Sequence, residues 1–371
     1  MALLAGLLLR ADPLAAQHRT PWRFEAFGDL AYLRDFNEPA NHLFRSRGTA
    51  FRVNEWDLNM VGAYTRKAPS QGSRLGLELT VHAGKDAELF GFSATAPDLG
   101  GSRWLRHLGP TNVSYLAPVG RGLTLQTGIF GSVIGYDSLY AKDNLNYTRP
   151  WGADFTPYLM LGLNASYPFG DRLTGTLVLV NGYWHLAHAN NTPSVGTQLA
   201  WKAAPRTTLK QTLLVGPHQQ HTSLALWRFV SDSIAEWKAE RATIAFEYQA
   251  ATERVDTAGR PRAWWMSAQL PARWNVRGGF SVAARPEIAW DSHGRWTLAR
   301  QTVKALTTTL EYRVSHHRTT GRLRLEYRLD DSRGPDGGFF ADDLRLVPRQ
   351  QLLSFGLLLG FDGAPAAAKQ E

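Results

Sequence analysis

The stretch RLGLELTVHA, residues 74–83, alternates apolar and polar side chains along its whole length. Leu77 and Leu79 fall on one side of the chain, whereas Glu78 and His82 fall on the other. Because successive side chains of a β-strand point to opposite faces of a sheet, this period of two indicates a strand with one apolar face. Strands of soluble proteins cluster at ~5–6 residues, while a transmembrane β-strand needs ~9–11. The length of this stretch therefore favours a strand that crosses a membrane.

The same alternation recurs in the middle of the chain and near its C-terminus. Segments 243–249, 320–329 and 351–361 each place apolar residues on one face and polar or small residues on the other. Since the outer face of a transmembrane barrel meets lipid, we expect these apolar faces to point outward. The residues predicted to face lipid are Leu75, Leu77, Leu79, Val81, Leu323, Leu325, Leu329, Phe355, Leu357 and Leu359.

The links between candidate strands alternate in length. Outer-membrane barrels have an even number of strands, short periplasmic turns and longer outer loops. We therefore predict an all-β fold, a transmembrane antiparallel β-barrel of about 16 strands in meander order, with both termini in the periplasm. Strands are expected to begin near 24, 51, 73, 111, 123, 155, 173, 195, 207, 222, 241, 262, 278, 299, 319 and 350. Long links are expected at 34–50, 84–110, 135–154, 183–194 and 331–349, and short links at 119–122, 168–172, 204–206 and 315–318.

Two parts of the pattern are less regular. Links in 216–298 are all of intermediate length, so the alternation is unclear there. Pro286 falls inside a predicted strand, and a closed barrel has no free edge at which a missing N–H is harmless. We expect a β-bulge at this proline, or a strand boundary different from the predicted one.

Composition excludes several classes of protein. The chain has no Cys, which rules out disulfide scaffolds, thiol catalysis and iron–sulfur clusters. Its net charge is +9, charged residues make up 20% and aromatic residues 11%, which is too aromatic for a disordered chain. No apolar run approaches the ~20 residues that a membrane helix needs. A membrane protein of this composition must cross as a closed barrel.

The ends of the chain suggest a simple division. Residues 2–9 are apolar and Ala15-Ala16-Gln17 could end a signal peptide, but no positive charge precedes Ala2. An ordinary disordered N-terminus is the alternative. The expected division is 1–16 as a degenerate or truncated signal peptide, 17–23 as a periplasmic segment, 24–362 as the barrel and 363–371 as a flexible tail.

Two long stretches resemble a bacterial family of putative β-barrel porins, OmpL-like. They are LELTVHAGKDAELFGFSATAPDLGGSRWLRHLGPTNVSYLAPVGRG (77–122) and GYDSLYAKDNLNYTRPWGADFTPYLMLGLNASYPF (135–169), supported by NGYWHLAHANN (181–191), GPHQ (216–219) and EYRLDDSRGPDGGFF (326–340). The resemblance covers about 24–362. It implies an outer-membrane barrel and a porin, and it carries no functional residues over to this chain.

Charged residues lie on the polar faces of the C-terminal strands. A charge that faces lipid at mid-depth costs ~2–4 kcal/mol, so we expect these side chains to face the lumen. Rings of arginine in a pore wall select for anions. The alternative is that they pair with glutamates across the lumen, and both can hold. The pore-lining candidates are Arg285, Glu287, Arg322, Arg324, Glu326 and Arg328.

Segment 135–154 is expected to fold into the lumen and narrow the pore. It is too polar to form a strand, yet its Tyr147 and Trp151 could pack against a wall. Its carboxylates, Asp137 and Asp143, would then face wall arginines and create a transverse field that favours polar solutes. The longer loop 84–110 could do the same.

Other patterns point only weakly to chemistry. His221 and Ser223 resemble the His-x-Ser of outer-membrane phospholipases, but no Asn precedes the histidine. We expect the remaining histidine pairs and acidic clusters to be solvated loops rather than metal sites. These are His185 with His188, His316 with His317, Asp330-Asp331 with Asp336, and Asp342-Asp343.

The expected function is passive diffusion of small polar or anionic solutes through the bacterial outer membrane. We expect no enzymatic activity, no cofactor and no nucleic-acid partner. The expected partners are outer-membrane lipid, lipopolysaccharide, small polar solutes and further copies of the chain. A plugged structural or adhesive barrel is the main alternative, and an outer-membrane lipid hydrolase is the second.

Overall fold

The computed structural model describes residues 21–88, 102–154, 156–183, 192–219, 224–256 and 262–363, with Leu186, Asn190 and Gly259. The expected signal peptide 1–16, residues 89–101 of the long loop and the end of the expected tail lie outside the described residues. His185, His188, His221 and Ser223 also lie outside them. Within the described part of the chain, no helix is long and apolar enough to cross a membrane.

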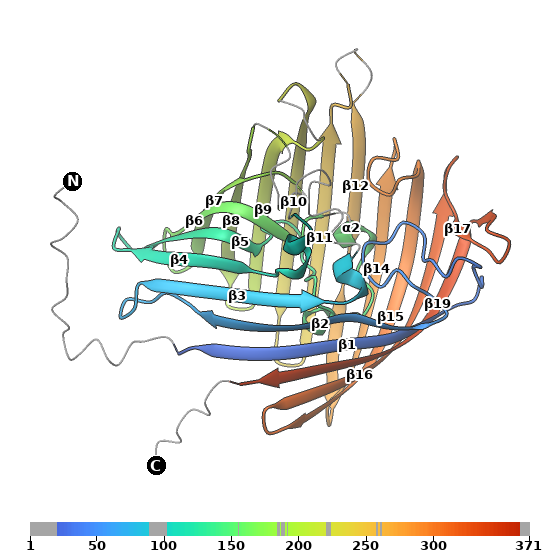
Figure 1. The fold of residues 1–371 in the computed structure, drawn as a ribbon, viewed down its shortest axis with the longest axis horizontal. Helices are drawn as coiled ribbons and strands as arrows, with labels where there is room; N and C mark the ends of the chain where they lie inside the picture. The colour runs from blue at the N-terminus through green and yellow to red at the C-terminus, as the bar shows by residue number, and fades with distance from the viewer. Residues whose placement is uncertain are drawn as a thin grey trace.

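The chain folds into a closed antiparallel β-barrel of 16 strands in meander order (Figure 1). The strands β12 and β13 count as one interrupted strand, because each of them pairs with both β11 and β14. The barrel strands are β1 Arg23–Asp35, β2 Trp56–Lys67, β3 Leu75–Ala83, β4 Thr111–Ala117, β5 Leu123–Gly131, β6 Leu159–Pro168, β7 Leu173–Val180, β8 Ser194–Ala204, β9 Thr207–Pro217, β10 Trp227–Lys238, β11 Ala242–Glu253, β12 Ala263–Gln269, β13 Ala272–Arg277, β14 Phe280–Asp291, β15 Gln301–His316, β16 Thr319–Arg333 and β19 Arg349–Asp362. The remaining elements are the strands β17 Phe339–Phe340 and β18 Leu346–Val347, the 3₁₀ helices η2 Ser102–His107, η3 Ala141–Asp143 and η4 Leu224–Leu226, and the helix α2 Trp151–Asp154.

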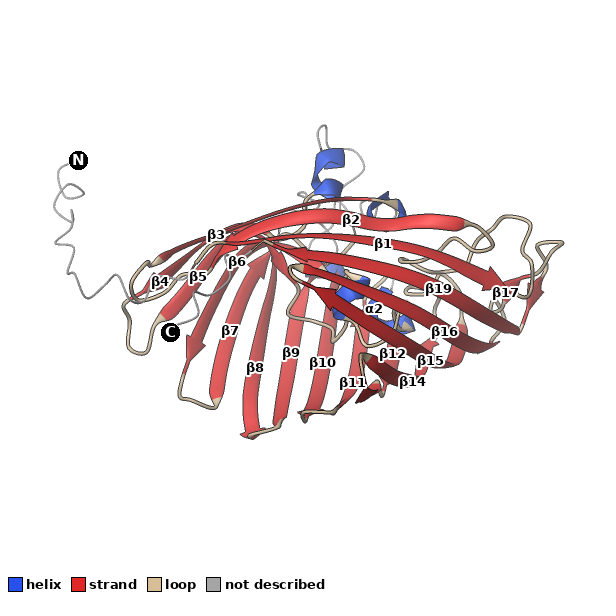
Figure 2. Ribbon diagram, turned by 90° about the horizontal axis from the view of Figure 1, so that it is seen from below, coloured by secondary structure: helices blue, strands red, loops and turns tan. Residues whose placement is uncertain are grey.

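The barrel closes because the first strand pairs with the last. β1 pairs with β2 on one side and with β19 on the other, and Ala31 lies opposite Gly356 in the second pair. Figure 2 shows the strands as one continuous curved wall. A closed wall satisfies backbone hydrogen bonds without a free edge, as a lipid environment requires.

The links alternate strictly between the two rims. Long links follow the odd-numbered strands of the meander and short links follow the even-numbered ones, so all long links leave from one rim. The unclear region also obeys this rule, with long links 218–226, 254–262 and 292–300 against short links 239–241 and 278–279. The predicted separation of the long and short links is therefore confirmed. We call the two ends the long-loop rim and the short-turn rim.

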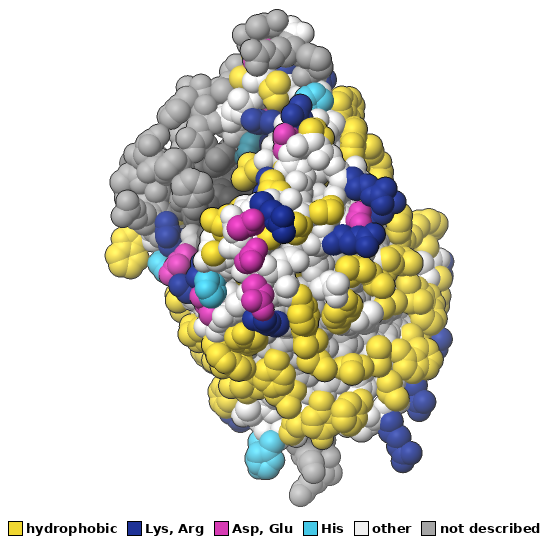
Figure 3. All heavy atoms as spheres, turned by 90° about the vertical axis from the view of Figure 1, so that its right-hand side faces the viewer, with side chains coloured by type: hydrophobic (Ala, Val, Ile, Leu, Met, Phe, Trp, Pro, Cys, Tyr) yellow, Lys and Arg dark blue, Asp and Glu magenta, His cyan; other side chains and the backbone are white. Residues whose placement is uncertain are grey.

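The outer surface is apolar and the inner surface polar. Leu75 is 63% exposed, Leu325 47% and Phe355 42%, values expected of side chains that face lipid rather than water. All ten residues predicted to face lipid lie on the outer surface, with Leu357 half-buried and the others exposed. Figure 3 shows the apolar side chains gathered as a broad belt on one side of the molecule, with charged side chains beyond it.

Pro286 causes no bulge in its own strand. β14 pairs with β15 without a register shift, and Pro286 lies opposite Leu306. The irregularity lies in the neighbouring strand, which is interrupted between Gln269 and Ala272. Because the Pro286 carbonyl accepts from the Leu270 N–H at 3.1 Å, the edge of the proline that lacks an N–H faces this interruption. The expected bulge is thus corrected to a break in the partner strand.

Candidate functional site

The link between β5 and β6, residues 132–158, folds into the barrel, and we call it the inner loop. It contains η3 and α2, and Figure 1 shows α2 among the surrounding strands. Tyr147 is 0% exposed and Trp151 is 1% exposed. Since backbone N–H and C=O groups buried without partners are costly, the inner loop needs hydrogen-bond partners on the barrel wall.

Arg324 of β16 binds the first half of the inner loop. Its Nη1 donates to the carbonyl oxygens of Ala141 at 2.9 Å and Asn146 at 3.0 Å, and its Nη2 donates to the carbonyl of Asn144 at 2.7 Å. Its Nε donates to the Glu311 carboxylate at 2.7 Å. One guanidinium therefore satisfies three loop carbonyls while its charge is balanced by a wall carboxylate.

Two wall glutamates accept hydrogen bonds from the second half of the loop. Glu326 accepts from the N–H groups of Tyr147 at 2.5 Å and Thr148 at 2.8 Å, and from the Thr148 hydroxyl at 2.5 Å. Glu287 accepts from the Trp151 N–H at 2.5 Å. The wall thus offers acceptors where the loop presents N–H groups, and these charge-assisted bonds are among the stronger kinds.

Arg285 and Arg328 complete the attachment. The Nη1 of Arg285 donates to the Thr148 carbonyl at 2.7 Å, and the Nη1 of Arg328 donates to the Arg149 carbonyl at 3.1 Å. Arg328 also forms an ion pair with Asp330 at 2.9 Å. Arginine suits this task because its donors spread in a rigid plane and reach several oxygens at once.

The three arginines that hold the loop are fully buried. The side chains of Arg285, Arg324 and Arg328 are 0%, 0% and 1% exposed, and each forms an ion pair with a buried carboxylate. Their charges are therefore balanced inside the wall and do not lie on a water-filled surface. All six predicted pore-lining residues, these arginines with Arg322, Glu287 and Glu326, hydrogen-bond to the inner loop.

The two predicted loop carboxylates line a hollow of the lumen together with the wall arginine Arg322. Asp137 accepts from the Gln269 amide at 2.7 Å, and burial raises the pKa of Asp137. Asp143 pairs with Lys142 at 2.9 Å. Among the described residues, neither forms an ion pair with an arginine, because backbone carbonyls of the loop already occupy the guanidinium donors. Arg285 still acts on Asp137 at longer range, because its positive charge opposes the rise in the pKa of Asp137.

A second segment, residues 36–55 between β1 and β2, packs on the inner loop from the long-loop rim. Phe44 lies against Trp151 with ring centroids 6.0 Å apart. Arg47 pairs with Asp154 at 2.7 Å, and both side chains are at most 1% exposed. The guanidinium also lies 4.9 Å from the Trp151 ring centroid. Sequence reasoning missed this segment, because it has neither apolar periodicity nor a recognised motif.

A buried carboxylate joins the link 84–110 to the same cluster. Asp86 accepts from the Ala50 N–H at 2.7 Å and lies 3.7 Å from the Arg149 guanidinium. Burial raises the pKa of Asp86 to about 7, against the lowering effect of Arg149. Three long links therefore meet inside the barrel.

Tyr147 packs closely against Gly356 of the wall, where a larger residue would require the tyrosine ring to move. A Cβ placed on Gly356 would lie 3.0 Å from the tyrosine ring. The Tyr147 hydroxyl donates to Asp29 at 2.9 Å and accepts from the Asn59 amide at 2.7 Å. The sequence pattern places Gly356 on the inward face of its strand, among polar and small residues, but it does not show that the Tyr147 ring packs there.

Between the inner loop and the short-turn rim the lumen is hollow. An open pocket of about 570 Å³ lies there, and we call it the vestibule. Its charged lining residues are the cations Lys210, Lys238, Arg273, Arg313 and Arg322 and the carboxylates Asp137, Asp143 and Glu236. Among the described residues, Lys210, Lys238 and Arg313 form no ion pair with a carboxylate, although Lys210 acts at longer range on the charge of Asp232.

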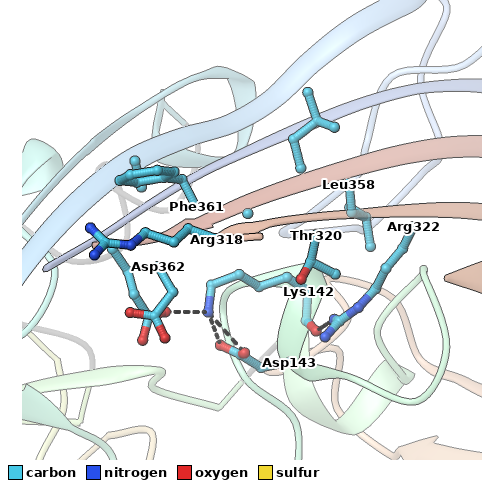
Figure 4. A pocket seen from close by; sticks show the side chains of 12 residues that line it. Lys142, Asp143, Arg318, Thr320, Arg322, Leu358, Phe361 and Asp362 are labelled. Carbon is cyan, nitrogen blue, oxygen red and sulfur yellow. Dashed lines mark hydrogen bonds and ion pairs between the residues drawn. The ribbon is translucent and has the colours of Figure 1, made fainter. Parts of the chain in front are cut away.

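A smaller pocket of about 150 Å³ lies beside the vestibule, near the start of β1. Figure 4 shows Lys142 in it, extending from the inner loop toward the wall. Its Nζ lies 3.9 Å from Glu25 and 2.9 Å from Asp143, and Arg322 donates to the Lys142 carbonyl. Lys142 thus pairs with two carboxylates, unlike Lys210, Lys238 and Arg313 of the vestibule.

The other residues singled out in the sequence are engaged in local contacts. His316 and His317 contact each other edge to face at the turn between β15 and β16, with ring centroids 4.2 Å apart. Arginines engage the acidic residues in the pairs Asp330–Arg328, Asp331–Arg333, Asp336–Arg300 and Asp343–Arg345. Within the described ranges, no group of three His, Asp or Glu side chains is placed to hold a metal ion.

Comparison with known proteins agrees with this architecture. The family model described as "Putative beta-barrel porin-2, OmpL-like" matches residues 21–361. No curated protein matches the chain in sequence.

Three solved structures share the fold. The outer membrane channel DcaP of Acinetobacter baumannii aligns with a TM-score of 0.57 and 9% identity, covering 97% of this chain and 100% of that one. An anion-selective porin from Comamonas acidovorans aligns with a TM-score of 0.55 and 12% identity, covering 93% and 100%. OmpT of Vibrio cholerae aligns with a TM-score of 0.53 and 10% identity, covering 96% and 100%. At these identities the likeness establishes the fold alone.

Proposed function

The chain belongs to the family of putative β-barrel porins, OmpL-like, and on that basis we propose that it is a bacterial outer-membrane channel for small anionic solutes. Solutes would enter from the periplasm through the vestibule and pass the inner loop, or travel in the opposite direction. Transport is passive, since a water-filled barrel needs only a hydrated path and a favourable field. The proposal includes no catalytic step and no cofactor.

The observation that carries this proposal is the uncompensated charge of the vestibule. Lys210, Lys238 and Arg313 lie on its walls without carboxylate partners among the described residues. Field lines concentrate in a narrow channel with low-dielectric walls, so unpaired cations there raise the local concentration of anions. The buried arginines contribute less, because carboxylates balance their charges.

The inner loop supplies the narrowing that a selective channel needs. It is held at mid-lumen by wall residues on β14 and β16, while the half of the lumen nearer the short-turn rim stays hollow. A purely structural barrel would have no use for a charged cavity of about 570 Å³ that opens to one rim. The cavity therefore favours the channel over the plugged alternative.

Assembly of several copies of the chain is part of the proposal. β4 and β7 have 7 and 8 residues, fewer than the ~9–11 of a membrane-spanning strand. An apolar hollow of about 470 Å³ on the outer face of β4–β7 is lined by Leu125, Leu163 and Leu177. A second copy of the chain that covers these short strands would relieve the mismatch between their apolar length and the thickness of the bilayer. One solved OmpT structure is described as a trimer form.

The test is ion selectivity of a charge-neutralised variant in planar bilayers. We expect Lys210→Gln/Lys238→Gln/Arg313→Gln to move the reversal potential in a KCl gradient toward cation preference while the channel stays open. The matched control, Arg300→Gln/Arg333→Gln/Arg345→Gln, removes three exposed arginines that are paired with aspartates near the long-loop rim. An equal shift in both variants, or none in the first, would contradict a selective role for the vestibule.

A further inference from the structure

Every short turn of the barrel carries an arginine. Seven links join strands at the short-turn rim, and each contains an arginine or directly follows one. These residues, which we call the arginine ring, are Arg74, Arg121, Arg172, Arg206, Arg241, Arg277 and Arg318. The turns differ in length and in the rest of their sequence, so turn geometry alone does not explain a shared arginine.

The arginines of the ring have fewer carboxylate partners than the exposed arginines near the long-loop rim. Among the described residues, Arg172, Arg206, Arg241 and Arg277 form no ion pair, and all four are exposed. Acidic residues within the seven short links are limited to Asp171, which pairs with Arg121, and Glu240.

Exposed arginines near the long-loop rim are paired instead. Arg300 pairs with Asp336, and Arg345 pairs with Asp343. Arg333 and Arg349 share Asp331. The two rims therefore differ in free positive charge more than in the number of arginines.

The ring also lies at a defined depth. Exposed aromatic side chains lie on the outer faces of the strands near these turns: Trp201, Trp237, Trp274 and Tyr312 before a turn and Phe280 after one, with exposures of 48%, 40%, 55%, 38% and 57%. Aromatic girdles mark the boundary between the hydrocarbon core and the headgroups. The arginine ring lies beyond these aromatic side chains, at the turns themselves, and is therefore level with the lipid phosphates.

We propose that the arginine ring binds the phosphate groups of anionic phospholipids in the periplasmic leaflet. Guanidinium groups recognise phosphate through two parallel hydrogen bonds, and basic residues at a membrane surface gain attraction from anionic headgroups. A ring around the circumference suits a lipid annulus better than a rigid polymer. This interaction is separate from solute passage, because the unpaired ring arginines do not line the vestibule.

The test uses the purified full-length barrel in neutral detergent, titrated with fluorescent phosphatidylglycerol and with fluorescent phosphatidylcholine. We expect Arg172→Gln/Arg206→Gln/Arg241→Gln/Arg277→Gln to weaken phosphatidylglycerol binding about tenfold and to leave phosphatidylcholine binding unchanged. The same four positions changed to lysine should keep most of the affinity. Heat-modifiable migration on gels confirms that each variant is a folded barrel.

The matched control removes the same charge from the other rim, as Arg300→Gln/Arg333→Gln/Arg345→Gln/Arg349→Gln, and should bind as the unmodified protein does. Equal losses in both variants would reduce the effect to net charge and overturn the proposal. Unchanged binding in the turn variant would overturn it as well. If the turn variant kept its lipid binding but no longer sedimented with purified peptidoglycan, the ring would be a cell-wall surface instead.

Discussion

Arg324→Gln should release the first half of the inner loop. The substitution removes a guanidinium that donates to three loop carbonyls and to Glu311, all in a fully buried setting. Hydrogen bonds to charged groups contribute ~1.5–3 kcal/mol each, and glutamine can restore one or two neutral ones. Breaking a buried ion pair costs ~3–5 kcal/mol, a loss that Arg273 limits here because it still pairs with Glu311 at 2.6 Å.

The loop attachment should therefore weaken by roughly 3–4 kcal/mol. Since ~1.4 kcal/mol is a factor of ten, the open population of residues 141–146 should rise by roughly two to three orders of magnitude. We expect faster amide exchange in this segment and larger, noisier single-channel currents. Glu326, Arg285 and Arg328 still hold the second half of the loop, so the barrel itself should remain folded.

Arg313→Gln is the matched control, because Arg313 lies opposite Arg322 in the β15–β16 pair and faces the vestibule without binding the loop. It should alter ion selectivity and leave current noise and amide exchange unchanged. If Arg324→Gln left both conductance noise and exchange of residues 141–146 at the unmodified level, the assignment of this arginine to loop attachment would be refuted.

Three further outcomes are expected. Leu325→Arg places a charge on the lipid face and should lower the free energy of unfolding by ~2–4 kcal/mol in a urea titration in vesicles, whereas Leu325→Ile should change it little. Gly356→Val should displace the Tyr147 ring and raise the noise of the single-channel current. Gly360→Val, near the end of the same strand, is the control, and equal current noise in both variants would contradict the packing of Tyr147 on Gly356. Because burial raises the pKa of Asp86 to about 7, the free energy of unfolding should fall as pH rises from about 4 to about 7 and level off above it. Asp86→Asn should flatten this pH dependence. An unaltered pH profile in the variant would exclude this carboxyl group as its cause.

The barrel could be predicted from the sequence because a transmembrane strand leaves a direct signature. The period of two in Leu75–Ala83 and in Thr319–Arg333 reports which face meets lipid, and most strand starts follow from it. The differences are local: β2 begins at Trp56 rather than near 51, and β10 at Trp227 rather than near 222. Both strands follow long links, whose apolar residues imitate the first residues of a strand.

The site was predictable only in part, for a physical reason. That Arg285 and Arg324 point inward follows from the cost of a charge in lipid. What they bind does not, because their partners are backbone carbonyls, and every residue has one. The segment 36–55 contributes Phe44 and Arg47 to the same cluster through contacts that no local sequence pattern predicts.

Single-channel recording of the unmodified protein in a planar bilayer shows whether the hollow, cationic lumen conducts anions. We expect discrete, stable conductance steps and a reversal potential in a KCl gradient that shows chloride preferred over potassium. A folded barrel with no conductance would mean that the long links plug the lumen, and a preference for potassium would mean that Lys210, Lys238 and Arg313 do not control the path.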